Sequence, residues 1–271
     1  MKLQDIIRSK KEIIINLFCT LYGQEHYERF SILFDRVIFL FPNLYEEDKQ
    51  QYLNELSQNY YISPLPISIL LDRLQYKSRC ATFIPMLQKK QEGIYQGTNF
   101  IVFNLTNQTH PSQNLDTILL HELKHLFTYH AIISSSSIIT KVGVSYLREC
   151  LFDGIAKPVS EYFHTINEVL TEFDAEYLTA LLHETTEIFS GEKNKPIIQY
   201  WYQDYFPLIT NLSRNDQSLL RQIELDSDFS KIELLSDIDL ISRLELATFT
   251  PFPKRKQKRK QLSYFDKNKK K

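Results

Sequence analysis

One stretch of the chain constrains its fold more than any other: residues 118–126 read ILLHELKHL. The apolar residues recur at helical spacing, and the pattern predicts a helix over 114–129. Side chains four residues apart lie on the same face of a helix, so His121 and His125 would point in the same direction. Polar groups in so apolar a segment indicate a buried helix whose polar residues serve one site.

Two imidazoles on one helix face can bind one metal ion, and the pattern HExxH is typical of zinc sites. Glu122 would lie beside the metal, where a carboxylate can accept a proton from an activated water. The sequence therefore predicts Zn²⁺ as cofactor, His121 and His125 as ligands, and Glu122 as a catalytic general base. The competing interpretation is an exposed helix on which these residues occur together by coincidence.

A second predicted helix, over 166–188, carries acidic residues on one face. Glu168, Glu172 and Ala175 are spaced i, i+4 and i+7, so two carboxylates and one small residue share that face. A carboxylate from it would complete a three-ligand site with an open fourth position, which is typical of catalytic zinc. The small residue would let the two helices approach closely.

Residues 167–172, which read NEVLTE, resemble the ligand helix of the gluzincins. In these thermolysin-like and aminopeptidase-like metallopeptidases the third ligand lies in an N-E-x-x-[ST]-[DE] helix, and every defined position matches. The chain is also similar to small bacterial proteins that pair HExxH with an NEGxTE helix across a β-hairpin. The resemblance covers about residues 98–183. It implies that Glu168 is the third ligand and that Glu172 orients one of the histidines, although Val169 replaces the frequent glycine and the gap between the two motifs is longer than in thermolysin-like enzymes.

The sequence also fits a second set of metal ligands. Some phage-associated and regulator-associated peptidases pair HExxH with an E-x-x-A helix, which 172–175 also matches, and that register would make Glu172 the ligand. Glu149 is a weaker candidate. Metzincins are excluded, because Thr128 and Ala131 stand where their glycine and third histidine would fall.

These residues predict a hydrolase that cleaves peptide or protein substrates. The oxyanion formed during hydrolysis needs a second donor besides the metal, and the candidates are Tyr162 and His164. The predicted strand over 99–105 is expected to be the sheet edge along which an extended substrate pairs. The alternatives are a degenerate, non-catalytic zincin scaffold that acts as a binding or toxin-associated protein, and a nucleic-acid-binding protein.

The pattern along the chain predicts an α+β fold with a zincin-like core: a small antiparallel sheet, the active-site helix, a hairpin and the ligand helix. The hairpin is expected from the runs 142–152 and 155–163 around an Asp-Gly pair. Helices are predicted over 4–22, 25–41 and 45–58 and after Pro66. The expected regions are a helical N-terminal part (1–77), the core (78–190), a helical C-terminal part (191–250) and a disordered basic tail (251–271).

Charge and composition limit the possible binding partners and the location of the protein. Residues 254–271 hold ten Lys or Arg against one acid, Asp266, so this tail could bind an anionic partner such as nucleic acid or a membrane surface, or simply remain a solubilising end. The chain has only six glycines and no phosphate-binding glycine loop, which argues against nucleotide binding. Three cysteines without a CxxC pair, and no long apolar run, predict a soluble cytoplasmic protein without a transmembrane segment.

Overall fold

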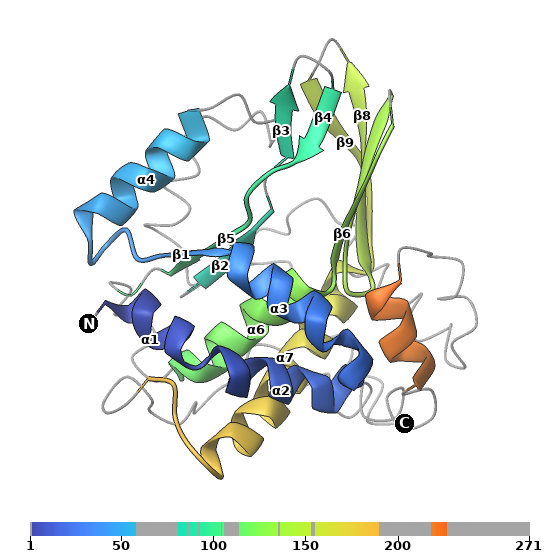
Figure 1. The fold of residues 1–271 in the computed structure, drawn as a ribbon. Helices are drawn as coiled ribbons and strands as arrows, with labels where there is room; N and C mark the ends of the chain where they lie inside the picture. Colours follow the sequence, from blue (N-terminus) through green and yellow to red (C-terminus); the bar gives the residue numbers. More distant parts are fainter. Residues whose placement is uncertain are drawn as a thin grey trace, which may run out of the picture.

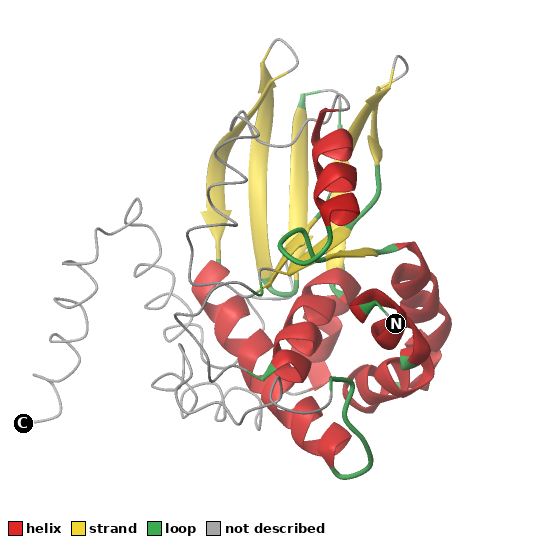
Figure 2. Cartoon of the chain, turned by 90° about the vertical axis from the view of Figure 1, so that its left-hand side faces the viewer, coloured by secondary structure: helices red, strands yellow, loops and turns green. Residues whose placement is uncertain are grey.

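The computed structural model describes nine segments of the chain. Most of the helices gather on one side, and one helix lies beside the strands on the other side (Figure 2). The described residues are 2–57, 81–85, 87–90, 93–103, 105, 114–134, 136–152, 155–189 and 218–226. The fold is mixed α+β, as predicted.

The N-terminal part is helical but more broken than its periodicity suggested (Figure 1). Its helices are α1 (Leu3–Ser9), α2 (Lys11–Tyr22), the 3-10 turn η1 (Gln24–His26), α3 (Tyr27–Arg36) and α4 (Glu46–Ser57). The helix predicted over 4–22 is two helices, because Lys10 leaves helical geometry at φ −103° and ψ 10°. The prediction over 45–58 is confirmed as α4.

The prediction of a helix over 25–41 was wrong at its C-terminal end, where the chain forms strand β1 (Ile38–Leu40). Residues 37–41 read VIFLF, and so short an apolar run suits a buried strand as well as a helix. The tertiary structure decides for the strand, because residues 38–40 pair in parallel with residues 100–102.

Strand β1 belongs to a three-stranded sheet in the order β1-β5-β2, with β2 at Ala81–Ile84 and β5 at Phe100–Phe103. The sheet is mixed rather than antiparallel, since β1 runs parallel to β5. The prediction that the strand over 99–105 is the edge was wrong, because β5 is the central strand. Ile38 of β1 pairs with Phe100, 62 positions later in the chain, and such distant pairing leaves no signal in local periodicity. Among the described strands, β2 is the edge strand next to helix α6.

Two further sheets are antiparallel. Strands β3 (Leu87–Lys90) and β4 (Gly93–Gln96) form one hairpin, and a four-stranded sheet follows the order β6-β7-β8-β9. Its strands are β6 (Tyr129–Ile133), β7 (Ser137–Val142), β8 (Ser145–Phe152) and β9 (Ile155–Tyr162). The predicted hairpin is present as β8 and β9, but two strands that the sequence analysis missed precede it.

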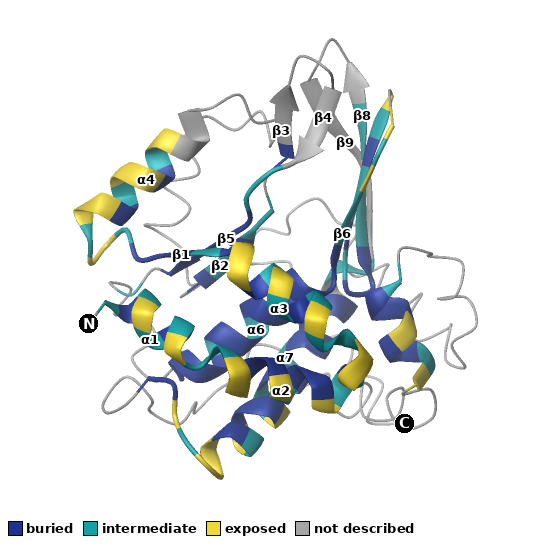
Figure 3. Ribbon diagram, viewed as in Figure 1, coloured by how far each residue is buried: buried dark blue, intermediate teal, exposed yellow. Residues whose placement is uncertain are grey.

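Helices α6 (Leu115–Phe127) and α7 (His164–His183) pack against each other at the centre of the molecule. The side chain of Asn114 caps α6 by accepting from the backbone N–H groups of Asp116 and Thr117, as short polar side chains do at helix starts. Every residue of α6 except Ile118 and His121 is buried, which Figure 3 shows in dark blue. Helix α7 ends five residues before the predicted limit at 188.

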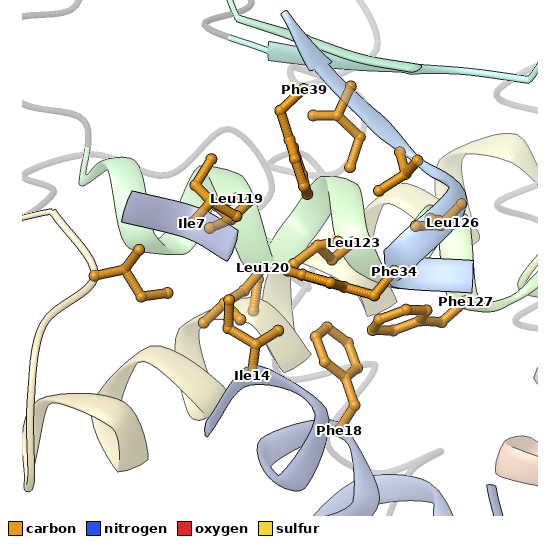
Figure 4. Packing of buried hydrophobic residues seen from close by; sticks show 14 of the residues in the cluster. Ile7, Ile14, Phe18, Phe34, Phe39, Leu119, Leu120, Leu123, Leu126 and Phe127 are labelled. Carbon is orange, nitrogen blue, oxygen red and sulfur yellow. The ribbon is translucent and has the colours of Figure 1, made fainter. Parts of the chain in front are cut away.

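The apolar face of α6 packs on the N-terminal helices, so these parts share one core (Figure 4). Phe127 contacts Phe18 and Phe30 at ring-centroid distances of 4.8 and 4.7 Å. The same core includes Ala175, Leu178 and Leu182 of α7, so it holds both helices. The two helices that carry the predicted ligands are therefore among the most constrained elements of the fold.

Beyond α7, the structure describes one more helix, at residues 218–225. Four of the predictions lie outside the described residues: the helix after Pro66, the Asp153-Gly154 turn, the rest of the region 191–250 and the tail 251–271. No helix in the described part of the chain combines the length and the apolar character that crossing a bilayer requires.

Candidate metal centre

Helix α6 directs its two histidines at one point. The Nε2 atoms of His121 and His125 lie 3.0 Å apart, and the two rings are nearly perpendicular, at 81°. Both side chains are largely enclosed, with 12% and 9% exposed. The one-turn spacing read from the sequence therefore produces a converging pair of nitrogen donors.

Glu168 of α7 brings a carboxylate to the same point. Its Oε2 lies 3.7 Å from His121 Nε2, and its Oε1 lies 3.4 Å from His125 Nε2. Among the described residues, these three side chains form the group of His, Cys, Asp and Glu whose ligand atoms come close enough to hold one metal ion. Residues far apart in the sequence thus meet where the HExxH helix and the acidic helix cross.

The donor set fits a small tetrahedral cation. Ligand atoms about 2.0–2.1 Å from zinc in tetrahedral geometry lie about 3.3–3.4 Å from one another. The two Nε2 atoms lie 3.0 Å apart, Glu168 Oε1 lies 3.4 Å from His125 Nε2, and Glu168 Oε2 lies 3.7 Å from His121 Nε2, so the separations lie on both sides of that value. Two imidazole nitrogens and one carboxylate oxygen also match the ligand types that zinc prefers.

Glu172 contacts the other nitrogen of His121. Its Oε2 lies 2.9 Å from His121 Nδ1, so this carboxylate would accept a hydrogen bond from Nδ1–H, which in the neutral ring makes Nε2 the coordinating nitrogen. The geometry places Glu168 with the two Nε2 atoms and Glu172 behind one ring. Glu149 lies on strand β8, outside this group.

The electrostatics of the site favour positive charge at its centre. Burial alone would lower the pKa of His121, but Glu168 and Glu172 raise it to about 10. Burial lowers the pKa of His125 to about 3, so this imidazole is neutral at pH 7. Burial acts to raise the pKa of Glu168, but the imidazoles lower it far below its usual value. An ionised carboxylate therefore lies against one neutral and one protonated ring.

Glu122 lies between the two histidines in sequence and faces the edge of the three-stranded sheet. Its Oε2 accepts a hydrogen bond of 2.6 Å from the backbone N–H of Phe83 in β2. The side chain is buried, and its charge acts to raise the pKa of His121. The carboxylate is thus held between the candidate metal ligands and the edge strand. The sequence could not predict this contact, because no local pattern relates Phe83 to α6.

The start of α7 is tied to the turn between β7 and β8. Asn167, the residue before Glu168, is buried and accepts at its Oδ1 a 3.1 Å hydrogen bond from the backbone N–H of Val144. The adjacent Gly143 has φ +57°, and a Cβ atom there would lie 2.0 Å from Asn167 Oδ1. The asparagine of the NExxTE pattern therefore anchors the start of α7, and the absence of a Cβ atom at Gly143 leaves space for its side chain.

We expect Gly143→Ala to destabilise the protein by about 1–3 kcal/mol, because left-handed geometry costs a non-glycine residue roughly 1–2 kcal/mol and the new methyl group meets Asn167. Urea denaturation measures this change. The double variant Gly143→Ala/Asn167→Ala removes the overlap, so its loss of stability is expected to be smaller than the sum of the two single losses. Additive losses would show that the close approach is unimportant.

The two predicted oxyanion donors lie at the junction of β9 and α7. Tyr162 is the last residue of β9, and its side chain is outside the described part. His164 is the first residue of α7 and is close enough to affect the pKa values of His125 and Glu168. Between them, Phe163 takes a left-handed backbone with φ 57°. Strained residues of this kind often border functional sites, and this one gives the chain its sharp entry into α7.

Comparisons of the chain with protein-family models, curated proteins and solved structures find no match.

Proposed function

We propose that this protein is a zinc-dependent hydrolase of peptide bonds. The observation that carries the proposal is the convergence of His121, His125 and Glu168, from two packed helices, next to the buried carboxylate of Glu122. Three protein ligands that leave one position open are typical of catalytic zinc, whereas structural zinc sites are closed by four protein ligands. The succession of β2, α6, the β8–β9 hairpin and α7 supports a zincin-like core.

Zinc, when bound here, would lower the pKa of a water molecule toward about 7 and polarise the substrate carbonyl. His121, His125 and Glu168 would hold the ion, and Glu172 would keep His121 in the coordinating tautomer. Glu122 would take a proton from the attacking water and deliver it to the nitrogen of the leaving amine. The hydrogen bond from the Phe83 backbone supports this role, since it holds the carboxylate in a fixed orientation beside the two histidines.

The substrate would pair with the outer edge of β2. This strand packs against α6, and within the described residues no strand pairs with it on the side away from β5. Extended peptides add to such edges through backbone hydrogen bonds. The N–H group of Phe83 does not serve the β2–β5 pairing, since Glu122 accepts it, so the edge and the catalytic carboxylate are adjacent.

The first test is the zinc content of the purified protein after incubation with excess zinc and removal of unbound metal. We expect one zinc per chain in the wild type and in His183→Ala, and almost none in His125→Ala. His183 is a matched control, because it also lies in this helix pair but contacts Asp116 rather than the centre. Equal zinc content in the two variants, or no zinc in the wild type, would refute the proposal.

A further inference from the structure

Lys124, inside the HExxH motif, is part of a closed ring of buried charges. The other members are Asp174 of α7 and two residues of the 218–225 helix, Arg221 and Glu224. All four side chains are buried, with between 0% and 8% of each residue exposed. This charge ring, as we call these four residues, contains two cations and two anions in alternation, so its formal charge is zero.

Each member of the charge ring contacts the next one. The Lys124 ammonium pairs with Asp174 and, at 2.7 Å, with Glu224 Oε1. Arg221 binds both oxygens of Asp174, at 2.5 and 2.6 Å, and Glu224 Oε2 at 2.8 Å. Two-pronged pairing of this kind fixes orientation as well as distance.

The surroundings of the charge ring hold the 218–225 helix in place. Tyr22 of α2 donates a 3.0 Å hydrogen bond to Glu224 Oε2. Lys141 of β7 donates to the last carbonyls of the helix, those of Ile223 and Glu224, at 2.5 and 3.0 Å. A cation at these carbonyls is favourable, because the C-terminal end of a helix carries partial negative charge. Figure 1 shows the helix, in orange, beside the N-terminal helices.

The charge ring lies directly beside the candidate metal centre. Lys124 is the neighbour of the ligand His125, and its ammonium also donates to the carbonyl of Leu170, at 3.2 Å. Leu170 lies between Glu168 and Glu172 on α7. The ring therefore joins the turn of α6 that carries one histidine to the turn of α7 that carries both carboxylates.

We infer that the charge ring is a positioning device that holds Glu168 opposite His121 and His125, so that the 218–225 helix, outside the two motifs, is a required part of the metal centre. This inference rests on the proposed function for the identity of the ion. Arg221 is the member to test, because it makes two links of the ring and is not itself a candidate metal ligand. Its removal leaves Asp174 and Glu224 to share one ammonium group in a buried site, where unpaired charge is unfavourable.

The experiment compares Arg221→Met with Asp116→Asn in the full-length chain. Asp116 is a matched control, since it is fully buried and joins α6 to the far end of α7 and the residues after it, through His183, Ile188 and Phe189. Zinc affinity is measured by competition with a chromophoric chelator, and amide hydrogen exchange of residues 168–172 is measured on the metal-free protein. Thermal unfolding gives the stability of each variant, and Arg221→Lys, which keeps the charge, is a milder second variant.

We expect Arg221→Met to raise the zinc Kd by about 10–100-fold, the range found for groups that orient metal ligands, and to speed exchange in 168–172. Arg221→Lys is expected to lie between it and the wild type. Asp116→Asn is expected to lower the unfolding temperature with an unchanged Kd and unchanged exchange in 168–172. If both variants lose stability and neither alters Kd or local exchange, the ring is only a structural tie. A wild type that binds no zinc refutes the proposed function, while the exchange comparison still decides whether the ring orders the start of α7.

Discussion

Glu122→Gln is expected to lower the rate of peptide hydrolysis by about 10²–10⁴-fold, which is the usual contribution of a positioned general acid–base group. The amide cannot take a proton from water, so the step assigned to this carboxylate is lost. Zinc content should stay at the wild-type value, because Glu122 is not among the three converging ligands.

The substitution changes chemistry while leaving packing almost untouched. A glutamine oxygen can still accept the hydrogen bond from the Phe83 backbone, so thermal unfolding should match that of the wild type. The assay is digestion of a diverse peptide library, with cleavage products identified by mass spectrometry and kcat/KM then measured on the best substrate. Glu176→Gln is the matched control, since burial and the nearby Glu172 raise the pKa of Glu176 to about 8, and its side chain is therefore mostly neutral at pH 7.

Two results would contradict the catalytic assignment. Wild-type rates in Glu122→Gln would show that another group moves the proton. A wild type with stoichiometric zinc that cleaves no peptide in the library would instead favour a non-catalytic zincin scaffold, the alternative that the sequence left open.

Replacing each of the two acidic residues of α7 is expected to affect zinc binding to different degrees. Glu168→Gln should raise the zinc Kd by more than 100-fold, because it removes one of three ligands. Glu172→Gln should raise it by only about 10–100-fold, as expected for a group that orients a ligand. The reason is geometric: Glu168 approaches both Nε2 atoms, whereas Glu172 contacts Nδ1 of His121.

Competition with a chromophoric chelator measures both constants under the same conditions. The comparison also separates the two sequence registers, since the E-x-x-A pattern makes Glu172 the ligand. A larger loss in Glu172→Gln than in Glu168→Gln would support that register and would require the start of α7 to be rotated from its position here. Circular dichroism of each metal-free variant checks that the helices remain formed.

The elements that could be predicted from the sequence are those governed by local rules. Helix α6 follows from its apolar periodicity and the capping residue Asn114, and the β8–β9 hairpin follows from two extended runs around an Asp-Gly pair. Strand β1 could not be predicted in this way, because its five-residue apolar run satisfies helix and strand patterns equally and only pairing with β5 decides between them. The edge strand was misassigned for the same reason, since sheet order depends on contacts between distant segments.

By itself, the sequence determined which side chains can share a face. The one-turn spacing of His121 and His125, and of Glu168 and Glu172, is a property of helical geometry and needs no neighbours. Only the tertiary structure decided which carboxylate meets the Nε2 atoms, which backbone N–H holds Glu122, and where the charge of Lys124 is neutralised. These outcomes depend on the angle and register at which α6, α7, β2 and the 218–225 helix pack, and packing is set by the whole core rather than by any single segment.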